Sequence, residues 1–264
     1  MTAAPLLLHA APADAAPLAV ISAMDDELRR IVPLLAGVRT VHQGSRAFHA
    51  GTLHGVPVVV AQCGIGKVAA AATVALLAAR FAPRALLLTG VAGGLADGVR
   101  VGDAVVADHL LQHDFDVSPL FPRYVVPSAG RARFAADPQL SDRVAAAAAA
   151  CLAGALGGVE CAAVGGQAPR VHRGLLVSGD RFVATAAESA ALRRALPDAL
   201  AVEMEGAAAA QVCADFGLPF AVLRVVSDRA DDAAHVDFLR FTREVASVVT
   251  QAVVVAAVAA LAEP

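Results

Sequence analysis

Apolar and polar positions along this chain switch between two periods that predict strands and helices in turn. Short apolar runs at 18–23, 85–89, 174–178 and 220–226 are typical of buried strands. An alanine-rich segment at 66–81 instead repeats its apolar residues at helical spacing. Because strands alternate with helices, the pattern predicts an α/β protein whose sheet is covered on both faces.

The same pattern gives the remaining elements. Residues 48–53 and 56–62 flank Gly55 and predict a hairpin, since glycine permits the backbone angles of a tight turn. The segment 25–36 predicts an amphipathic helix, and 114–133, with its Pro and Phe residues, predicts an irregular loop or lid. Further strands are expected at 103–111 and 200–203, and further helices at 139–156, 186–196, 206–216 and 236–262.

The chain is expected to form one domain over residues 18–264, because no linker-like stretch divides it. Residues 1–17 lack the basic start and long apolar core of a signal peptide and are expected to be a mobile extension. The mean hydropathy is high, at +0.63. However, the longest apolar run, 252–262, is shorter than the roughly 20 residues that span a bilayer. A membrane protein is therefore not expected.

Charge and cysteine content exclude further classes. A net charge of −3 gives no reason to expect nucleic acid or an anionic membrane surface as a partner. Cys63, Cys151, Cys161 and Cys213 are scattered and suggest neither a zinc site nor a disulfide framework. We therefore expect reduced thiols, a cytoplasmic location, and no metal or cofactor.

The end of the last predicted strand carries the first sign of an active site. Arg224 and Asp228 interrupt the apolar run, and their spacing of four places both on one face of a strand. Charges are rarely buried unless they are paired or functional. Ligands of open α/β sheets bind at the carboxyl ends of strands. The segment therefore predicts a site at this edge.

Five further motifs precede this segment. They are Ile21-Ser-Ala-Met-Asp-Asp-Glu27, the two glycine-rich turns at 63–68 and 89–94, Val177-Ser-Gly-Asp-Arg-Phe-Val183, and Ala201-Val-Glu-Met-Glu-Gly206. In this order the five motifs resemble the 5′-methylthioadenosine/S-adenosylhomocysteine nucleosidases of the purine nucleoside phosphorylase superfamily. The resemblance implies a three-layer fold with a central mixed sheet flanked by helices.

The resemblance also implies catalytic roles for three residues. Asp228 is expected to protonate the purine at N7, and Glu27 to activate the attacking water. Arg224 is expected to orient that water or the neighbouring carboxylates. The residues alone also allow plain structural roles: Asp228 as a helix cap, Glu27 as an acid in a first helical turn, and Arg224 in a salt bridge.

Substrate contacts follow from the same resemblance. Glu205 is expected to accept hydrogen bonds from the ribose hydroxyls, and Met204 to pack against the sugar and base. Phe182 is expected to stack on adenine while the Val183 backbone reads its polar edge. Ser227 and Gly93 are expected to line the same site.

Two departures from the family pattern affect the pocket. Val91 replaces a serine that is common in the second glycine-rich turn, so a hydroxyl is missing there. The segment 117–124 also differs from the commoner version. Val117 and Phe238 are expected to form an apolar pocket for the 5′-substituent, shared with the partner subunit of a homodimer. Lys67 is expected at the surface, and Asp114 behind the residues that contact substrate.

The sequence thus predicts a hydrolase that releases adenine from 5′-methylthioadenosine and S-adenosylhomocysteine. Three alternatives stay open: a phosphorolytic purine nucleoside phosphorylase, a futalosine-type hydrolase, and a non-catalytic nucleoside-binding protein. A non-catalytic protein is expected to have lost Glu27, Glu205 or Asp228, and all three are present. The resemblance implies that a phosphorylase of this superfamily carries an arginine that holds phosphate. The matching place in this chain has Asp25, Asp26 and Glu27, whose charges would repel phosphate.

Overall fold

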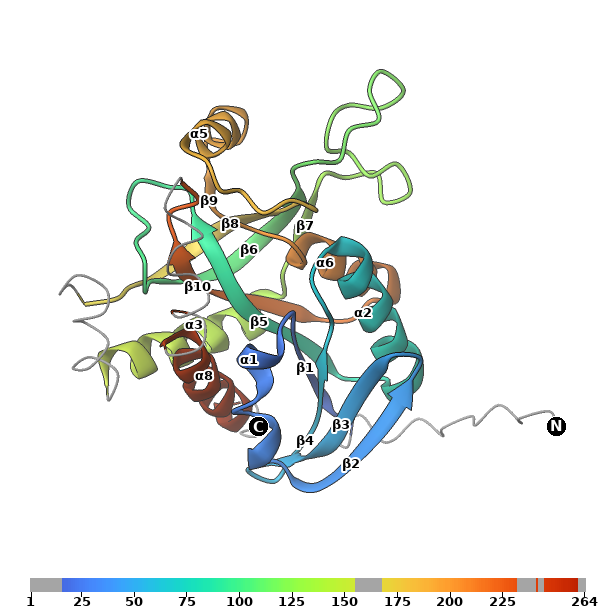
Figure 1. The fold of residues 1–264 in the computed structure, drawn as a ribbon. Coiled ribbons are helices and arrows are strands. Elements are labelled where there is room, and N and C mark those ends of the chain that lie inside the picture. Colours follow the sequence, from blue (N-terminus) through green and yellow to red (C-terminus); the bar gives the residue numbers. More distant parts are fainter. Residues whose placement is uncertain (1–15, 155–167, 232–240, 242–244, 261–264) are drawn as a thin grey trace.

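One mixed sheet of ten described strands runs through the molecule (Figure 1). The computed structural model describes residues 16–154, 168–231, 241 and 245–260. The strands are β1 (Leu18–Ser22), β2 (Ala36–Gln43), β3 (Arg46–Leu53), β4 (Val56–Gln62), β5 (Ala85–Gly94), β6 (Ala104–Gln112), β7 (Arg133–Ala135), β8 (Val171–Ser178), β9 (Ala199–Glu203) and β10 (Phe220–Asp228). The helices are α1 (Asp25–Leu28), the 3₁₀ turn η2 (Val32–Leu34), α2 (Lys67–Phe81), α3 (Pro138–Ala153), α5 (Ala186–Ala195), α6 (Gly206–Phe216) and α8 (Ser247–Ala260).

Five of the strands close into a ring. β5 pairs with β10, β10 with β6, β6 with β8, β8 with β9, and β9 again with β5. β5 also pairs with β1 up to Leu88, and it reaches β9 only at Gly93 and Gly94. The neighbours of β5 therefore change between Leu88 and Gly93. A change of neighbours at the carboxyl ends of strands leaves a crevice of the kind that ligands occupy.

Helices cover the sheet on both faces. The side chains of a strand alternate between the two faces, so apolar residues at successive positions of β5 need a covering layer on each side. Leu86 and Leu88 of β5 belong to the same buried cluster as Val74 of α2 and Ala209 of α6. Leu87 belongs to a second cluster that includes residues of α3 and α8. Figure 1 shows α2 and α6 on one side of the sheet, and α1, α3 and α8 on the other. The predicted three-layer fold is confirmed.

Most predicted elements appear with small shifts in their ends, but the helix at 25–36 is wrong. Helix α1 ends at Leu28, η2 follows, and β2 begins at Ala36. Pro33 lacks the N–H that a continuing helix needs, and Gly37 adopts a φ of 63°. β2 is an exposed edge strand, so it has no continuous buried face to reveal it in the sequence.

The hairpin predicted around Gly55 is confirmed as β3 and β4. His54 and Gly55 both have positive φ, which is the geometry of the turn that two-residue hairpins favour. The predicted loop at 114–133 ends in the short strand β7. The predicted extension lies outside the described residues up to residue 15, as does the first part of the predicted C-terminal helix. Within the described residues, no helix combines the length and apolar content that crossing a membrane requires.

Candidate active site

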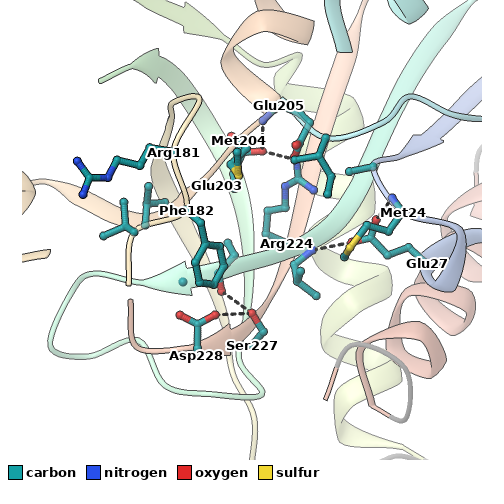
Figure 2. Close-up of a pocket in the computed structure, with 17 residues that line it drawn as sticks. Met24, Glu27, Arg181, Phe182, Glu203, Met204, Glu205, Arg224, Ser227 and Asp228 are labelled. Carbon is teal, nitrogen blue, oxygen red and sulfur yellow. Dashed lines mark hydrogen bonds and ion pairs between the residues drawn. The ribbon is translucent and has the colours of Figure 1, made fainter. Parts of the chain in front are cut away.

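A cavity of about 290 Å³ lies where β5 changes neighbours (Figure 2). This volume is close to that of the smaller ligand pockets, roughly 300 Å³. It brings together residues that are far apart in the sequence, from the turn after β1 and from α1, from β5, β9 and β10, and from the loop after β8. The predicted site residues that line it are Glu27, Val91, Gly93, Phe182, Val183, Met204, Glu205, Arg224, Ser227 and Asp228.

Arg224 is the buried cation of this cavity and is only 1% exposed. Its Nη2 donates to Glu205 Oε2 at 3.2 Å and also to Glu203 Oε2, and its Nη1 donates to the carbonyl of Thr89 at 3.2 Å. The side chain crosses directly over Gly90, where an added Cβ would lie 2.0 Å from Nη1. Glycine at this position is therefore required. The structural salt bridge that the sequence allowed is present, with two neighbouring carboxylates as partners. The predicted role of Arg224 in orienting water or these carboxylates for catalysis remains a prediction.

Glu203 is the residue of this site for which the sequence suggested no role. Its carboxylate accepts from the backbone N of Glu205 at 3.0 Å and of Gly206 at 2.9 Å, and it also accepts from Ser178 Oγ. It therefore caps the start of α6 while it pairs with Arg224. The signal was its distance of two residues from Glu205, within reach of the same buried arginine.

Glu205 is held from two sides. Its Oε1 accepts from the backbone N of Gly66 at 2.8 Å, and its Oε2 faces Arg224. Burial raises the pKa of Glu205 to about 7, and the negative charge of Glu203 adds to this, although Arg224 and Gly66 lower it. Three buried carboxylates, those of Glu27, Glu203 and Glu205, thus share one buried guanidinium.

This shared charge predicts a pH dependence of stability. The folded pKa of Glu205 lies above the ordinary value of 4.5, so the folded protein binds more protons than the unfolded chain between about pH 4.5 and 7. Its contribution to the free energy of unfolding is therefore fully present below this window and falls as pH rises through it, by about 3 kcal/mol. Glu205→Gln removes that loss.

We therefore expect wild type to lose stability relative to Glu205→Gln as pH rises from 4.5 to 7.5. Urea melts of both proteins across this range measure the difference. A difference that stays constant with pH would show that Glu205 remains ionised throughout.

Glu27 lies across the cavity from Asp228, next to Met24 (Figure 2). It is 1% exposed, and its carboxylate accepts from the backbone N of Met24 at 2.9 Å and of Val91 at 3.1 Å. Burial raises the pKa of Glu27, and the charge of Arg224 and the backbone hydrogen bonds only partly offset this. Glu27 lies in the first turn of α1, as the structural reading of the sequence expected, and its bond to the backbone N of Met24 caps that helix. Further lone pairs of the carboxylate remain to accept a proton from water.

Asp228 ends β10, and its carboxyl group is fixed by two hydrogen bonds. Oδ2 accepts from Ser227 Oγ at 2.8 Å, and Oδ1 accepts from the backbone N of Ala230 at 2.7 Å. Burial raises the pKa of Asp228, and these two hydrogen bonds lower it without cancelling the effect. A carboxylic acid with a raised pKa is suited to donating a proton near neutral pH.

Most of the remaining predicted substrate contacts also line this cavity. Phe182 is 42% exposed and lies on the cavity wall near Asp228 (Figure 2). Val91, Val183 and Met204 supply apolar walls. Val117 does not line the cavity of this single chain, so its predicted contact with the 5′-substituent remains a prediction. Phe238 lies outside the described residues.

Among the described residues, no group of three or more His, Cys, Asp or Glu side chains is placed to hold a metal ion.

Comparison with known proteins agrees with this geometry. Residues 17–259 match the family model described as the phosphorylase superfamily. The 5′-methylthioadenosine/S-adenosylhomocysteine nucleosidase of Neisseria meningitidis, solved with methylthio-immucillin-A, is 35% identical with a TM-score of 0.82, covering 93% of this chain and 99% of that one. The S-adenosylhomocysteine nucleosidase of Streptococcus pyogenes, solved with 5-methylthiotubericidin, is 30% identical with a TM-score of 0.81, covering 94% and 98%.

A futalosine hydrolase mutant of Helicobacter pylori is also similar, at 27% identity and a TM-score of 0.80, covering 92% of this chain and 99% of that one. The fold is therefore shared by nucleosidases of more than one specificity. The family match over almost the whole chain, and identities of 30–35% over more than nine-tenths of it, establish the relationship. The chain belongs to the phosphorylase superfamily and, within it, to the 5′-methylthioadenosine/S-adenosylhomocysteine nucleosidases.

Proposed function

We propose that this nucleosidase hydrolyses the N-glycosidic bond of 5′-methylthioadenosine and S-adenosylhomocysteine and releases adenine. The observation that carries the proposal is the charge of the cavity. Among the described residues that line it, Glu27, Glu203, Glu205 and Asp228 are acidic, whereas Arg181 and Arg224 are basic. Such a site favours the cation that develops on the sugar when the bond breaks.

Asp228 acts as the general acid in this proposal. Cleavage sends the electron pair of the C1′–N9 bond into the purine, which is a poor leaving group as an anion. Asp228 gives its proton to N7, so adenine departs neutral. The raised pKa of Asp228 and its rigid position between Ser227 and Ala230 support this role.

Glu27 acts as the general base. Water attacks C1′ on the face opposite the leaving adenine and loses a proton to the Glu27 carboxylate, which yields methylthioribose. Arg224 holds Glu205 in place, and Glu205 accepts hydrogen bonds from the ribose hydroxyls. Its charge also opposes the cationic sugar in the transition state. Met204, Phe182 and Val183 supply the contacts to the sugar and the base.

The same charges argue against phosphorolysis. A phosphate dianion entering beside Glu27 would meet buried carboxylates, while the guanidinium of Arg224 is already paired with Glu203 and Glu205. Like charges at this range disfavour each other strongly.

We further propose a homodimer that completes the 5′-pocket. Ile65, Val68, Leu120 and Phe121 are large apolar side chains that are at least 45% exposed in the single chain. Ile65 also lines the cavity. A partner covering these side chains would remove them from water and close the open side of the site. The free cysteines Cys63, Cys151 and Cys213 are consistent with the proposed cytoplasmic location.

Chromatography with mass detection after incubation with single substrates tests the proposal. Adenine and methylthioribose are expected from 5′-methylthioadenosine, and adenine and S-ribosylhomocysteine from S-adenosylhomocysteine. Release of a base from futalosine but from neither adenosine compound would assign the protein to the other specificity.

A further inference from the structure

Three segments beside the cavity are joined by one charged network. Lys67 begins α2, Asp114 follows β6, and Asp180 lies in the loop between β8 and α5. Lys67 Nζ donates to Asp114 Oδ1 at 2.6 Å, and the other oxygen of Asp114 accepts from the backbone N of Asp180 at 2.9 Å. Asp180 Oδ1 in turn accepts from the backbone N of Lys67 at 2.7 Å. The three residues therefore close a cycle of hydrogen bonds.

This network is better shielded than an ordinary surface ion pair. The Lys67 side chain is 15% exposed and that of Asp114 is 33% exposed. Partial burial alone raises the pKa of Asp114, but the hydrogen bonds from Lys67 and Asp180 and the Lys67 charge outweigh it, so the pKa lies below its ordinary value. Isolated exposed pairs contribute little to stability because water screens them and their side chains are free to move. Here the backbone N–H of Asp180 fixes the Asp114 carboxylate, and the backbone N–H of Lys67 fixes the Asp180 carboxylate.

Packing beneath the network fixes the loop as well. The ring of His113 lies against Gly179, where an added Cβ would be 2.4 Å from Nε2. Glycine is therefore required for the ring to lie this close. Burial lowers the pKa of His113, which favours the neutral imidazole. The position of Asp180 is thus fixed by the packing of His113 on the preceding Gly179 and by hydrogen bonds with Lys67 and Asp114.

Each end of the network leads to a different part of the substrate site. On one side, Gly66 directly precedes Lys67 and donates its N–H to Glu205 Oε1 at 2.8 Å. On the other, Phe182 and Val183 follow Asp180 by two and three residues and line the cavity. The network therefore sits between the carboxylate proposed to bind ribose and the residues proposed to bind adenine.

We propose that Lys67, Asp114 and Asp180 form a clasp that fixes the loop 179–183 relative to Glu205 and so sets the affinity for adenine nucleosides. The clasp rests on the proposed function for its substrate class. Its members are positioning residues, because they act through Phe182, Val183 and Glu205. They are not expected to take part in bond cleavage.

Lys67→Met and Asp114→Asn, singly and together, test the clasp. Methionine keeps most of the apolar stem of Lys67 and loses its charge. Asp114 accepts one hydrogen bond with each carboxylate oxygen, and asparagine replaces one of these oxygens by an NH₂ donor, so one of the two bonds is lost. We expect KM for 5′-methylthioadenosine and Kd for adenine to rise about three- to tenfold, with kcat changed less, since screened charge-assisted bonds have about this effect. The double variant should match the single ones, because either change opens the same cycle.

Two controls separate the clasp from a general loss of charge. Lys67→Arg keeps the cation and should retain near-normal affinity. Arg133→Met and Asp198→Asn break an ion pair of the same 2.6 Å length between β7 and the residue preceding β9, where neither partner lines the cavity. They should leave KM and Kd unchanged. Unchanged KM and Kd in the clasp variants, or effects that simply add in the double variant, would overturn the proposal.

Amide hydrogen exchange of the unliganded protein provides a readout that needs no substrate. Exchange in the segment 179–183 should accelerate in Lys67→Met and Asp114→Asn, and not in the Arg133 and Asp198 controls. Unaltered exchange would mean that the network does not hold the loop, whatever the substrate. Failure of wild type to release adenine would instead refute the proposed function, and the exchange measurement would still decide whether the clasp holds the loop.

Discussion

Asp228→Asn is expected to lower turnover of 5′-methylthioadenosine by about 10²–10⁴-fold, the usual contribution of a general acid. Asparagine is nearly isosteric with aspartate but has no proton to give to N7. Its carbonyl can still accept from the backbone N of Ala230, and its amide can donate to Ser227 Oγ, so both fixing contacts can be kept. Substrate binding should change little, because the lost interaction forms mainly in the transition state.

The leaving group provides the control for this variant. In a nitrophenyl thioriboside the leaving group is nitrophenolate, which departs without protonation at a purine nitrogen. Asp228→Asn should therefore slow the hydrolysis of this substrate far less than that of 5′-methylthioadenosine. Thermal melting measured beside the kinetics shows whether the variant is folded. Near-normal turnover of 5′-methylthioadenosine by a folded variant would reduce Asp228 to a structural role in the turn that ends β10.

Glu27→Gln is expected to lower turnover by a similar factor, about 10²–10⁴-fold, for a different reason. Glutamine cannot take the proton of the attacking water. It also has one acceptor oxygen for the two backbone N–H groups of Met24 and Val91, so one of these bonds is lost. That loss costs roughly 1–3 kcal/mol of stability, partly offset because a buried charge is removed.

The two variants should differ with the activated substrate. Water must still attack C1′ when the leaving group is a nitrophenol, so Glu27→Gln should remain slow where Asp228→Asn recovers. Comparing kcat for both substrates in both variants measures this difference. Equal recovery by the two variants would mean that Glu27 does not act on the attacking water.

The sequence was sufficient to predict the fold class and most of the site because the informative residues interrupt regular patterns. Arg224 and Asp228 stand out in an apolar strand, and the five motifs follow one another in a family order. All predicted site residues in the described part of the chain line one cavity, except Val117. Their catalytic and binding roles remain predictions.

The sequence was insufficient where a residue depends on distant neighbours. The spacing of two residues from Glu205 is the one local signal for Glu203, and its contacts with Arg224 in β10 and Ser178 in β8 come from distant parts of the chain. Lys67 was expected at the surface, yet it pairs with Asp114, 47 residues away. β2 was missed because it is an exposed edge strand whose polar positions outweigh its few apolar ones.

Turnover of 5′-methylthioadenosine in ¹⁸O-labelled water, with and without phosphate, tests the central claim most directly. In the proposed mechanism the buried carboxylates around Arg224 exclude phosphate and Glu27 activates water, so the rate should be independent of phosphate. The label should appear at C1 of free methylthioribose in both conditions. A rate that vanishes without phosphate, with methylthioribose 1-phosphate as the product, would contradict the account.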